Sequence, residues 1–235
     1  MTSTRTTLTS PTTRVVRIAM ATIALALCAP LGADAQEVEV SANAGWVSQY
    51  FYRGYLQKTS SASAGLDLSA GALSLGTWLA DVGDGTEIDL FGSVGGDLGG
   101  LNLSIGGTAY LYTGLFDETY LEVNLGAGYG PMSVEFSIGQ WDSPPAGGTV
   151  GDKSDYWFAA VTAEHEGFYG TVGSFGSDLD GAYGEVGYGF SAADLDWTIA
   201  GILNDSLASN LVNRDGDPTP GLTLVFGVGK TFGIN

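Results

Sequence analysis

Apolar and small polar residues alternate with a period of two along most of this chain. In LNLSIGGTAYLY (residues 101–112), Leu103 and Ile105 fall on one face, and Ser104 and Gly106 fall on the other. A period of two is that of a β-strand, because successive side chains point to opposite faces. The alternation predicts twelve strands, near residues 37–53, 60–71, 72–82, 87–99, 101–112, 118–129, 132–142, 156–166, 168–177, 181–192, 194–205 and 221–232.

The predicted strands are long, and the connections between them alternate in length. Most strands have at least ten residues, whereas strands of soluble sheets average about 5–6 and a tilted crossing of a bilayer takes about 9–11. Short turns alternating with longer loops are typical of outer-membrane barrels. We therefore predict an all-β fold, a transmembrane antiparallel up-and-down β-barrel of about 12 strands. Tight turns are expected near Gly71, Gly99, Gly130, Gly167 and Ser191, and the other connections at 54–59, 83–86, 113–117, 143–155, 178–180 and 206–220.

A soluble β-sandwich or a lipocalin-like barrel would also show this alternation. The polar face here consists mostly of Gly, Ser, Thr and Asn with single acids and almost no lysine, whereas soluble surfaces usually carry interspersed Lys and Glu. A ring of twelve long strands is also too wide for small side chains to fill as a dry core. Both features favour the membrane barrel over the soluble alternatives.

The N-terminus has the pattern of a secretory signal peptide. Three arginines precede an apolar run at residues 18–32, and small residues follow at Ala33 and Ala35. This order predicts cleavage after Ala35. The alternative, a transmembrane anchor, would need about 20 apolar residues. We therefore expect a signal peptide at residues 1–35 and an outer-membrane barrel at residues 36–235, in a Gram-negative bacterium.

The charge balance of the chain is strongly acidic. The whole sequence has 8 Lys and Arg against 26 Asp and Glu, a formal net charge of −18. Removal of residues 1–35 would leave 5 basic and 25 acidic residues and a net charge of −20. Such acidity argues against nucleic acid as a partner. Cys28 is the only cysteine, so the mature chain is expected to contain no disulfide.

Residues 41–96 begin with SANAGWVSQYFYRGY and contain GTW and EIDL further on. This order of an Asn, a Val-Ser, an aromatic pair, an Arg-Gly, a GTW and an acidic EIDL resembles the TorF-type porin family of proteobacteria. Residues 109–123 resemble the Tyr-rich hairpin that follows in that family. The sequence departs from the pattern at Gln49, where the family tends to have an acid. The resemblance implies an outer-membrane barrel of porin type and supplies no substrate. The matching residues are Asn43, Val47, Ser48, Tyr50, Arg53, Gly54, Gly76, Thr77, Trp78, Glu87, Ile88, Asp89, Tyr110, Tyr112, Tyr120 and Glu122.

The first strand places one arginine among aromatic residues. Strict alternation from Trp46 puts Tyr50 and Tyr52 on the lipid side, in an outer aromatic girdle, and puts Gln49 and Arg53 in the lumen. Arg53 would then meet carboxylates at the mouth of the pore. Two roles are open: a part of the constriction, or a structural salt-bridge partner that holds the mouth, since charges inside membrane proteins usually pair.

The same alternation puts seven acids on the polar face. A narrow channel lined by carboxylates concentrates cations and repels anions. We therefore expect a passive pore for small cations or neutral solutes, with outer-membrane lipid and lipopolysaccharide around the barrel. The alternative is a non-conducting structural or surface-recognition barrel, filled by loops such as 143–155 or 206–220. The predicted pore-lining residues are Arg53, Asp67, Glu87, Asp89, Glu122, Glu135, Glu185 and Asp196.

Signals for catalysis or metal binding are weak. His165 is the sole histidine, whereas a barrel hydrolase needs a histidine beside a serine and a third orienting residue, and zinc needs several His or Cys ligands. The acidic stretches 178–180 and 214–217 could bind calcium, but neither has the full loop pattern. No enzyme activity and no cofactor are expected. Five tryptophans are expected to anchor the barrel at the membrane interfaces: Trp46, Trp78, Trp141, Trp157 and Trp197.

Overall fold

A computed structural model describes residues 38–205, 208 and 220–234. The predicted signal peptide lies outside the described residues. Within them, no helix is long and apolar enough to cross a membrane. The twelve strands are β1 (Val38–Tyr52), β2 (Tyr55–Ala70), β3 (Leu73–Gly83), β4 (Gly85–Leu98), β5 (Leu101–Tyr112), β6 (Tyr120–Tyr129), β7 (Met132–Trp141), β8 (Ser154–His165), β9 (Phe168–Ser177), β10 (Ala182–Ala192), β11 (Leu195–Asn204) and β12 (Gly221–Gly233).

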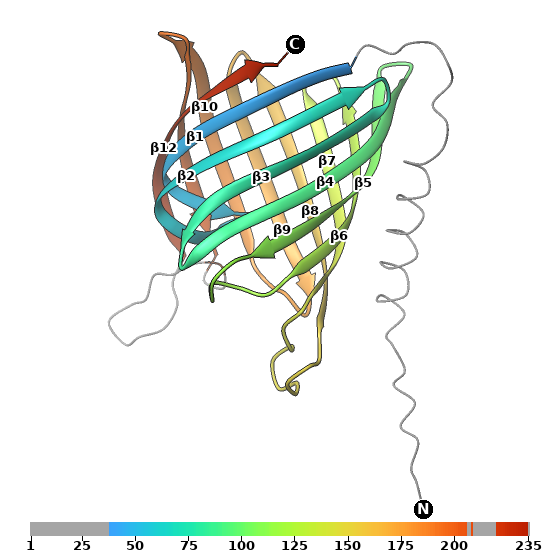
Figure 1. The fold of residues 1–235 in the computed structure, drawn as a ribbon, viewed down its shortest axis with the longest axis vertical. Coiled ribbons are helices and arrows are strands. Elements are labelled where there is room, and N and C mark those ends of the chain that lie inside the picture. The colour runs from blue at the N-terminus through green and yellow to red at the C-terminus, as the bar shows by residue number, and fades with distance from the viewer. Residues whose placement is uncertain (1–37, 206–207, 209–219, 235) are drawn as a thin grey trace, which may run out of the picture.

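The strands form one closed antiparallel barrel, and the predicted fold class is confirmed. Each strand pairs with its neighbours in sequence, and β1 pairs with β12 to close the ring, from Ser41↔Gly233 to Val47↔Gly227. The strands are strongly tilted, and the described chain ends lie at the upper end of the barrel in Figure 1. All twelve predicted strands are present, most within a few residues of their expected bounds.

The two ends of the barrel differ in their connections. At one end, here called the turn end, five two-residue turns join the strands, at 71–72, 99–100, 130–131, 166–167 and 193–194. All five were expected at these places. The opposite end, the loop end, carries longer connections at 113–119, 142–153, 178–181 and 205–220 together with short ones at 53–54 and 84, and residues 142–153 extend away from the barrel there (Figure 1).

The connection between β1 and β2 differs from the prediction. Residues 54–59 were expected to form a loop, but β2 begins at Tyr55 and only Arg53 and Gly54 form the turn. Both turn residues have positive φ, 46° for Arg53 and 89° for Gly54. Two such residues favour a tight hairpin turn whose twist matches that of its strands.

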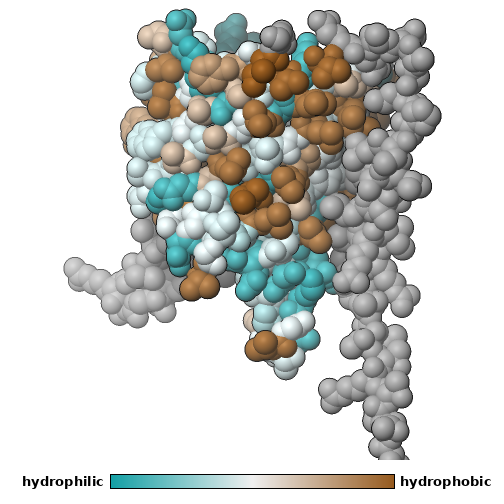
Figure 2. All heavy atoms as spheres, in the orientation of Figure 1, coloured by the Kyte–Doolittle hydropathy of each residue, from teal (hydrophilic) through white to brown (hydrophobic). Residues whose placement is uncertain are grey.

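The outward positions of the strands carry large apolar side chains that are exposed. Leu66, Leu125, Val186 and Leu222 are 43–71% exposed. Figure 2 shows apolar residues spread over the visible barrel wall and hydrophilic ones gathered toward the loop end. Apolar surface of this extent is unfavourable in water, so this exterior requires an apolar environment.

Candidate functional site

The hairpin between β1 and β2 folds into the lumen at the loop end. Gly54 is buried, and its carbonyl oxygen accepts a hydrogen bond from the side-chain amide of Asn204 on β11. A Cβ on Gly54 would lie 2.6 Å from the Cβ of Tyr183 on β10. Neither strand is a neighbour of β2 in the barrel. The hairpin tip therefore reaches across the barrel instead of standing above its rim.

Arg53, at the tip of this hairpin, binds two carboxylates in the lumen. Its Nη1 lies 2.5 Å from Glu122 Oε1, and its Nη2 lies 3.1 Å from Glu122 Oε2. The same Nη2 lies 2.6 Å from Glu135 Oε1. The guanidinium also stands over the ring of Phe158, 4.1 Å from the ring centroid. Paired N–H donors on one carboxylate form the strong, directional type of ion pair.

Glu122 on β6 is fully buried, at 0% exposure. Besides Arg53, it accepts hydrogen bonds from the hydroxyls of Tyr156 at 2.8 Å, Tyr110 at 3.2 Å and Tyr52 at 3.4 Å. These donors come from β8, β5 and β1. A buried carboxylate is stable only when it is paired and hydrogen-bonded, and Glu122 meets both conditions.

Glu87 and Asp89, on β4, face the same lumen. Glu87 is also 0% exposed, and its two oxygens accept hydrogen bonds from Tyr50 at 3.0 Å and Tyr112 at 3.4 Å. Asp89 is 9% exposed, and its Oδ1 is buried without a hydrogen-bond partner among the described residues. The two carboxylates thus differ, because tyrosine donors reach only Glu87.

Aromatic rings fill the rest of the loop half of the lumen. Tyr120 stacks on Trp141 at a centroid distance of 5.3 Å, and Phe158 packs against Phe175 at 4.9 Å. The loop half is therefore filled in this conformation. Ten of the twelve strands each contribute one of these buried inward residues: Ser61, Ala80, Glu87, Tyr110, Glu122, Ser137, Phe158, Phe175, Ile202 and Val225.

The turn half of the lumen is hollow. A cavity of about 520 Å³ lies there, and the inward residues that line it include Ser104, Gly126, Thr162 and Thr171. Glu135 also lines this cavity and joins it to the Arg53 cluster. Small polar side chains leave the middle of the barrel empty.

The structure places all eight predicted pore-lining residues on the inward side of the barrel, but in three settings. Arg53, Glu122 and Glu135 form one ion-paired cluster, and Glu87 and Asp89 lie in the filled loop half. The others lie apart: Asp67 accepts from Asn43 Nδ2 at 3.1 Å, Glu185 from Tyr169 at 2.5 Å, and Asp196 from Ser191 at 2.6 Å. Their role in lining a conducting pore stays a prediction.

The predicted position of Tyr50 and Tyr52 on the lipid side is wrong. Both hydroxyls bind lumenal carboxylates, Glu87 and Glu122 respectively. β1 is irregular at this point: its pairing with β2 passes over both Ser48 and the facing Ser60, whose φ is 62°, and the register shifts between Tyr50 and Phe51. The alternation that places Trp46 outward therefore does not continue to Tyr50 and Tyr52.

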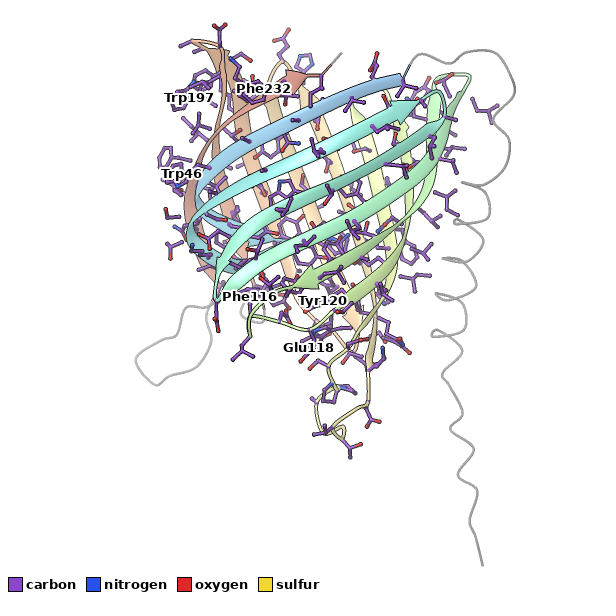
Figure 3. The ribbon with its side chains drawn as sticks, viewed as in Figure 1. Trp46, Phe116, Glu118, Tyr120, Trp197 and Phe232 are labelled. Atoms are coloured by element: carbon purple, nitrogen blue, oxygen red, sulfur yellow. The ribbon has the colours of Figure 1, made fainter. Side chains whose placement is uncertain are left out.

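Two of the five tryptophans are also wrongly predicted as interface anchors. Trp78 points inward, where it packs edge-on against Tyr50 at 5.4 Å, and Trp141 stacks on Tyr120 and donates to Asp117 Oδ1 at 3.0 Å. By contrast, Trp46 and Trp197 project outward from the barrel wall, and Tyr120 lies at the loop end (Figure 3).

The sequence reasoning missed the lumenal tyrosines as carboxylate partners. The alternation of residues 101–112 puts Tyr110 on the same polar face as Ser104, but it predicts neither the bond of Tyr110 to Glu122 nor that of Tyr156. A signal was present: inward positions near the loop end carry tyrosine where those near the turn end carry Ser or Gly, as in residues 104–112.

The described residues that were considered for catalysis or metal binding lie at strand ends and in connections. His165 lies at the turn end, and its side chain is 83% exposed, 3.9 Å from Glu166 Oε2. In residues 38–205, 208 and 220–234, no group of three or more His, Cys, Asp or Glu could hold a metal ion. Asp178, in the first acidic stretch, accepts from the Asp155 backbone N–H. The second stretch, 214–217, lies outside the described residues.

Comparisons with known proteins find similarity in fold. No family model and no curated protein matches the chain, so the resemblance to the TorF-type family stays a prediction. A structure from work on the in-meso crystallization of membrane proteins aligns with a TM-score of 0.57, at 7% identity, over 83% of this chain and 84% of that one. This likeness shows the fold alone.

Two porin structures align less well. The NanC porin gives a TM-score of 0.46 at 10% identity, over 82% of this chain and 98% of that one. OccK1 (OpdK) of Pseudomonas aeruginosa gives 0.40 at 12% identity, over 76% of this chain and 58% of that one.

Proposed function

We propose that this chain is an outer-membrane β-barrel of porin type that admits small cations and neutral solutes. One observation carries the proposal: large apolar side chains are exposed on the outward face of a closed barrel, while carboxylates and small polar residues face inward. Lipid would cover the first surface, and lipopolysaccharide its outer part. The TorF-type resemblance agrees with this assignment.

The preference for cations follows from the inward charges. The seven predicted pore-lining carboxylates share the lumen with the guanidinium of Arg53, which is already bound to Glu122 and Glu135. An excess of negative charge in a narrow aqueous space raises the local concentration of cations and repels anions.

Purified, refolded protein in planar bilayers tests this function. We expect current steps whose reversal potential, in a potassium chloride gradient, is shifted from zero toward the equilibrium potential of potassium. A shift toward the equilibrium potential of chloride would contradict the proposed preference.

The filled loop half favours a second candidate, a non-conducting barrel with a structural or recognition role. Arg53, Glu122 and the surrounding rings pack closely in this conformation, and Glu122 and Phe158 are 0% and 1% exposed. The same bilayer measurement separates the two candidates. Protein that is folded, as shown by its altered migration on gels before boiling, and yet gives no current would support the second candidate.

A lipid-soluble photoprobe tests the membrane placement independently of current. Leu103 and Phe136 point outward and are exposed, whereas Ser104 and Glu135 line the inner cavity. We expect label on the first pair. Label on Ser104 and Glu135 with none on Leu103 and Phe136 would refute the placement.

A further inference from the structure

Two carboxylates in the lumen have no cationic partner among the residues that the structure describes. Glu87 and Asp89 lie two residues apart on β4 and point to the same side. Basic side chains of the described residues have other contacts: Arg53 with Glu122, Lys58 with Asp81, Lys153 with Asp142, and Lys230 over the ring of Phe232. Buried carboxylates are costly without a counter-charge.

Asp89 also lacks a hydrogen-bond donor. Its Oδ1 is buried with no partner in the part of the chain that the structure describes, and the residue is 9% exposed. Glu87, by contrast, has the hydroxyls of Tyr50 and Tyr112. An unsatisfied buried acceptor of this kind has a free energy cost that an N–H donor would remove.

Aromatic residues flank Asp89 on both neighbouring strands. Trp78 on β3 and Tyr110 on β5 are its direct cross-strand partners. Tyr50 packs edge-on against Trp78. Carboxylates beside Trp and Tyr side chains are an arrangement that recognises organic ammonium ions, by charge and by cation–π attraction.

The position is approached from the turn end. Phe91 is the next inward residue on β4 beyond Asp89, and it lines a second cavity of about 340 Å³ together with Ser41 and Asp67. This cavity does not reach Asp89, so a solute in the hollow half would have to displace side chains, Phe91 among them, to contact it.

We propose that Glu87 and Asp89 bind the primary ammonium group of a small solute. The orphaned oxygen needs an N–H donor, which a quaternary ammonium lacks, and a neutral alcohol would bring no counter-charge to the two buried carboxyl groups. A calcium ion would want about 6–8 oxygen ligands, more than two carboxylates supply. This inference assigns one class of solute, primary ammonium compounds, to the lumen of the proposed channel. It rests on the proposed function, in which that lumen is open at the turn end.

Calorimetric titration of butylammonium chloride into the purified, folded barrel in neutral detergent tests the site. We expect saturable binding, with little heat from tetramethylammonium chloride or butanol. D89N should weaken butylammonium binding about tenfold or more, because an ionic hydrogen bond is lost. E87Q should weaken it less, since Tyr50 and Tyr112 remain.

D97N is the matched control. Asp97 lies on the same strand, but at the turn end, where it accepts from the Gly100 backbone N–H. Binding should match the wild type. Absent binding by folded wild-type protein, equal binding by D89N, or equally tight tetramethylammonium would overturn the site. Because calorimetry does not depend on current, a barrel that is silent in bilayers but binds butylammonium would refute the channel and leave the site intact.

Discussion

The loop half and the turn half of the lumen share the same twelve strands but have opposite contents. On β5, the inward residues change from Ser104 and Gly106 toward the turn end to Tyr110 and Tyr112 at the loop end. The loop half is packed with rings and ion pairs, and the turn half holds a cavity of about 520 Å³. Side-chain size at alternate positions, and not the barrel itself, therefore decides where the lumen is open.

The comparison also shows how the loop half is filled. A barrel this wide cannot be closed by small side chains. The long inward tyrosines extend only part of the way, and the hairpin tip at Arg53 and Gly54 supplies the rest. The constriction thus depends on a two-residue turn rather than on a long loop.

Replacing Arg53 with alanine should have the largest effect on the contrast between the packed loop half and the hollow turn half. Glu122 would keep its burial and lose its counter-charge, which costs about 3–5 kcal/mol. We expect the folded band on gels to convert to the unfolded band at a lower heating temperature. We also expect any current to increase as the loop half loosens. Lys153→Ala, which removes a half-exposed pair with Asp142, should cost under about 1 kcal/mol. Equal unfolding temperatures for the two variants would mean that Arg53 does not hold the loop half together.

Gly54→Ala should disturb the hairpin tip itself. Its added Cβ would meet Tyr183, and its φ of 89° is unfavourable for alanine. Gly99→Ala is the control, because φ is 66° but nothing lies within 4 Å of the added Cβ. Both variants should lose about 1–2 kcal/mol from backbone strain, and only Gly54→Ala should lose more and change the current. Identical behaviour would show that the tip does not pack in the lumen.

Leucine at matched serines compares the two halves directly. Ser137 is fully buried in the loop half, and Ser137→Leu should cost about 1–3 kcal/mol from overpacking. Ser104 lines the cavity of the turn half, and Ser104→Leu should change stability by no more than about 0.5 kcal/mol. Thermal unfolding of both variants measures the contrast, and an equal loss would mean that the turn half is not hollow.

Neutralising a carboxylate of the turn half should have the smallest effect. Glu185→Gln removes one inward charge without touching the Arg53 cluster, so the reversal potential should shift slightly toward zero. Asp81→Asn, at a residue paired with Lys58 outside the lumen, should leave the reversal potential unchanged. A larger shift for Asp81→Asn would locate the selective charges outside the lumen.

The sequence was sufficient to predict the strands, the five tight turns and the closed barrel. These features depend on local alternation and on turn residues such as Gly71 and Gly130, which are visible within a few positions. The faces of β3 to β12 follow from the same rule. Prediction failed at β1, where the strand is irregular between Val47 and Phe51 and where Tyr50 and Tyr52 point inward.

The contents of the lumen could not be predicted in the same way. Arg53 lies 69 positions before Glu122 and 82 before Glu135. Such contacts depend on strand tilt and on the direction in which a hairpin folds, and neither leaves a pattern in neighbouring residues. The expectation that Arg53 meets carboxylates was confirmed, whereas the tyrosine donors around them were not foreseen.

These long separations have a consequence for assembly. Arg53 belongs to the first hairpin, and its carboxylate partners stand on the sixth and seventh strands, half a circumference away. Until the strands curl into a ring, Glu122 and Glu135 cannot meet their cation and must stay hydrated. Closure of the ring and dehydration of these charges should therefore be a single late event, and an unclosed intermediate would retain a hydrated, charged face that resists entry into hydrocarbon.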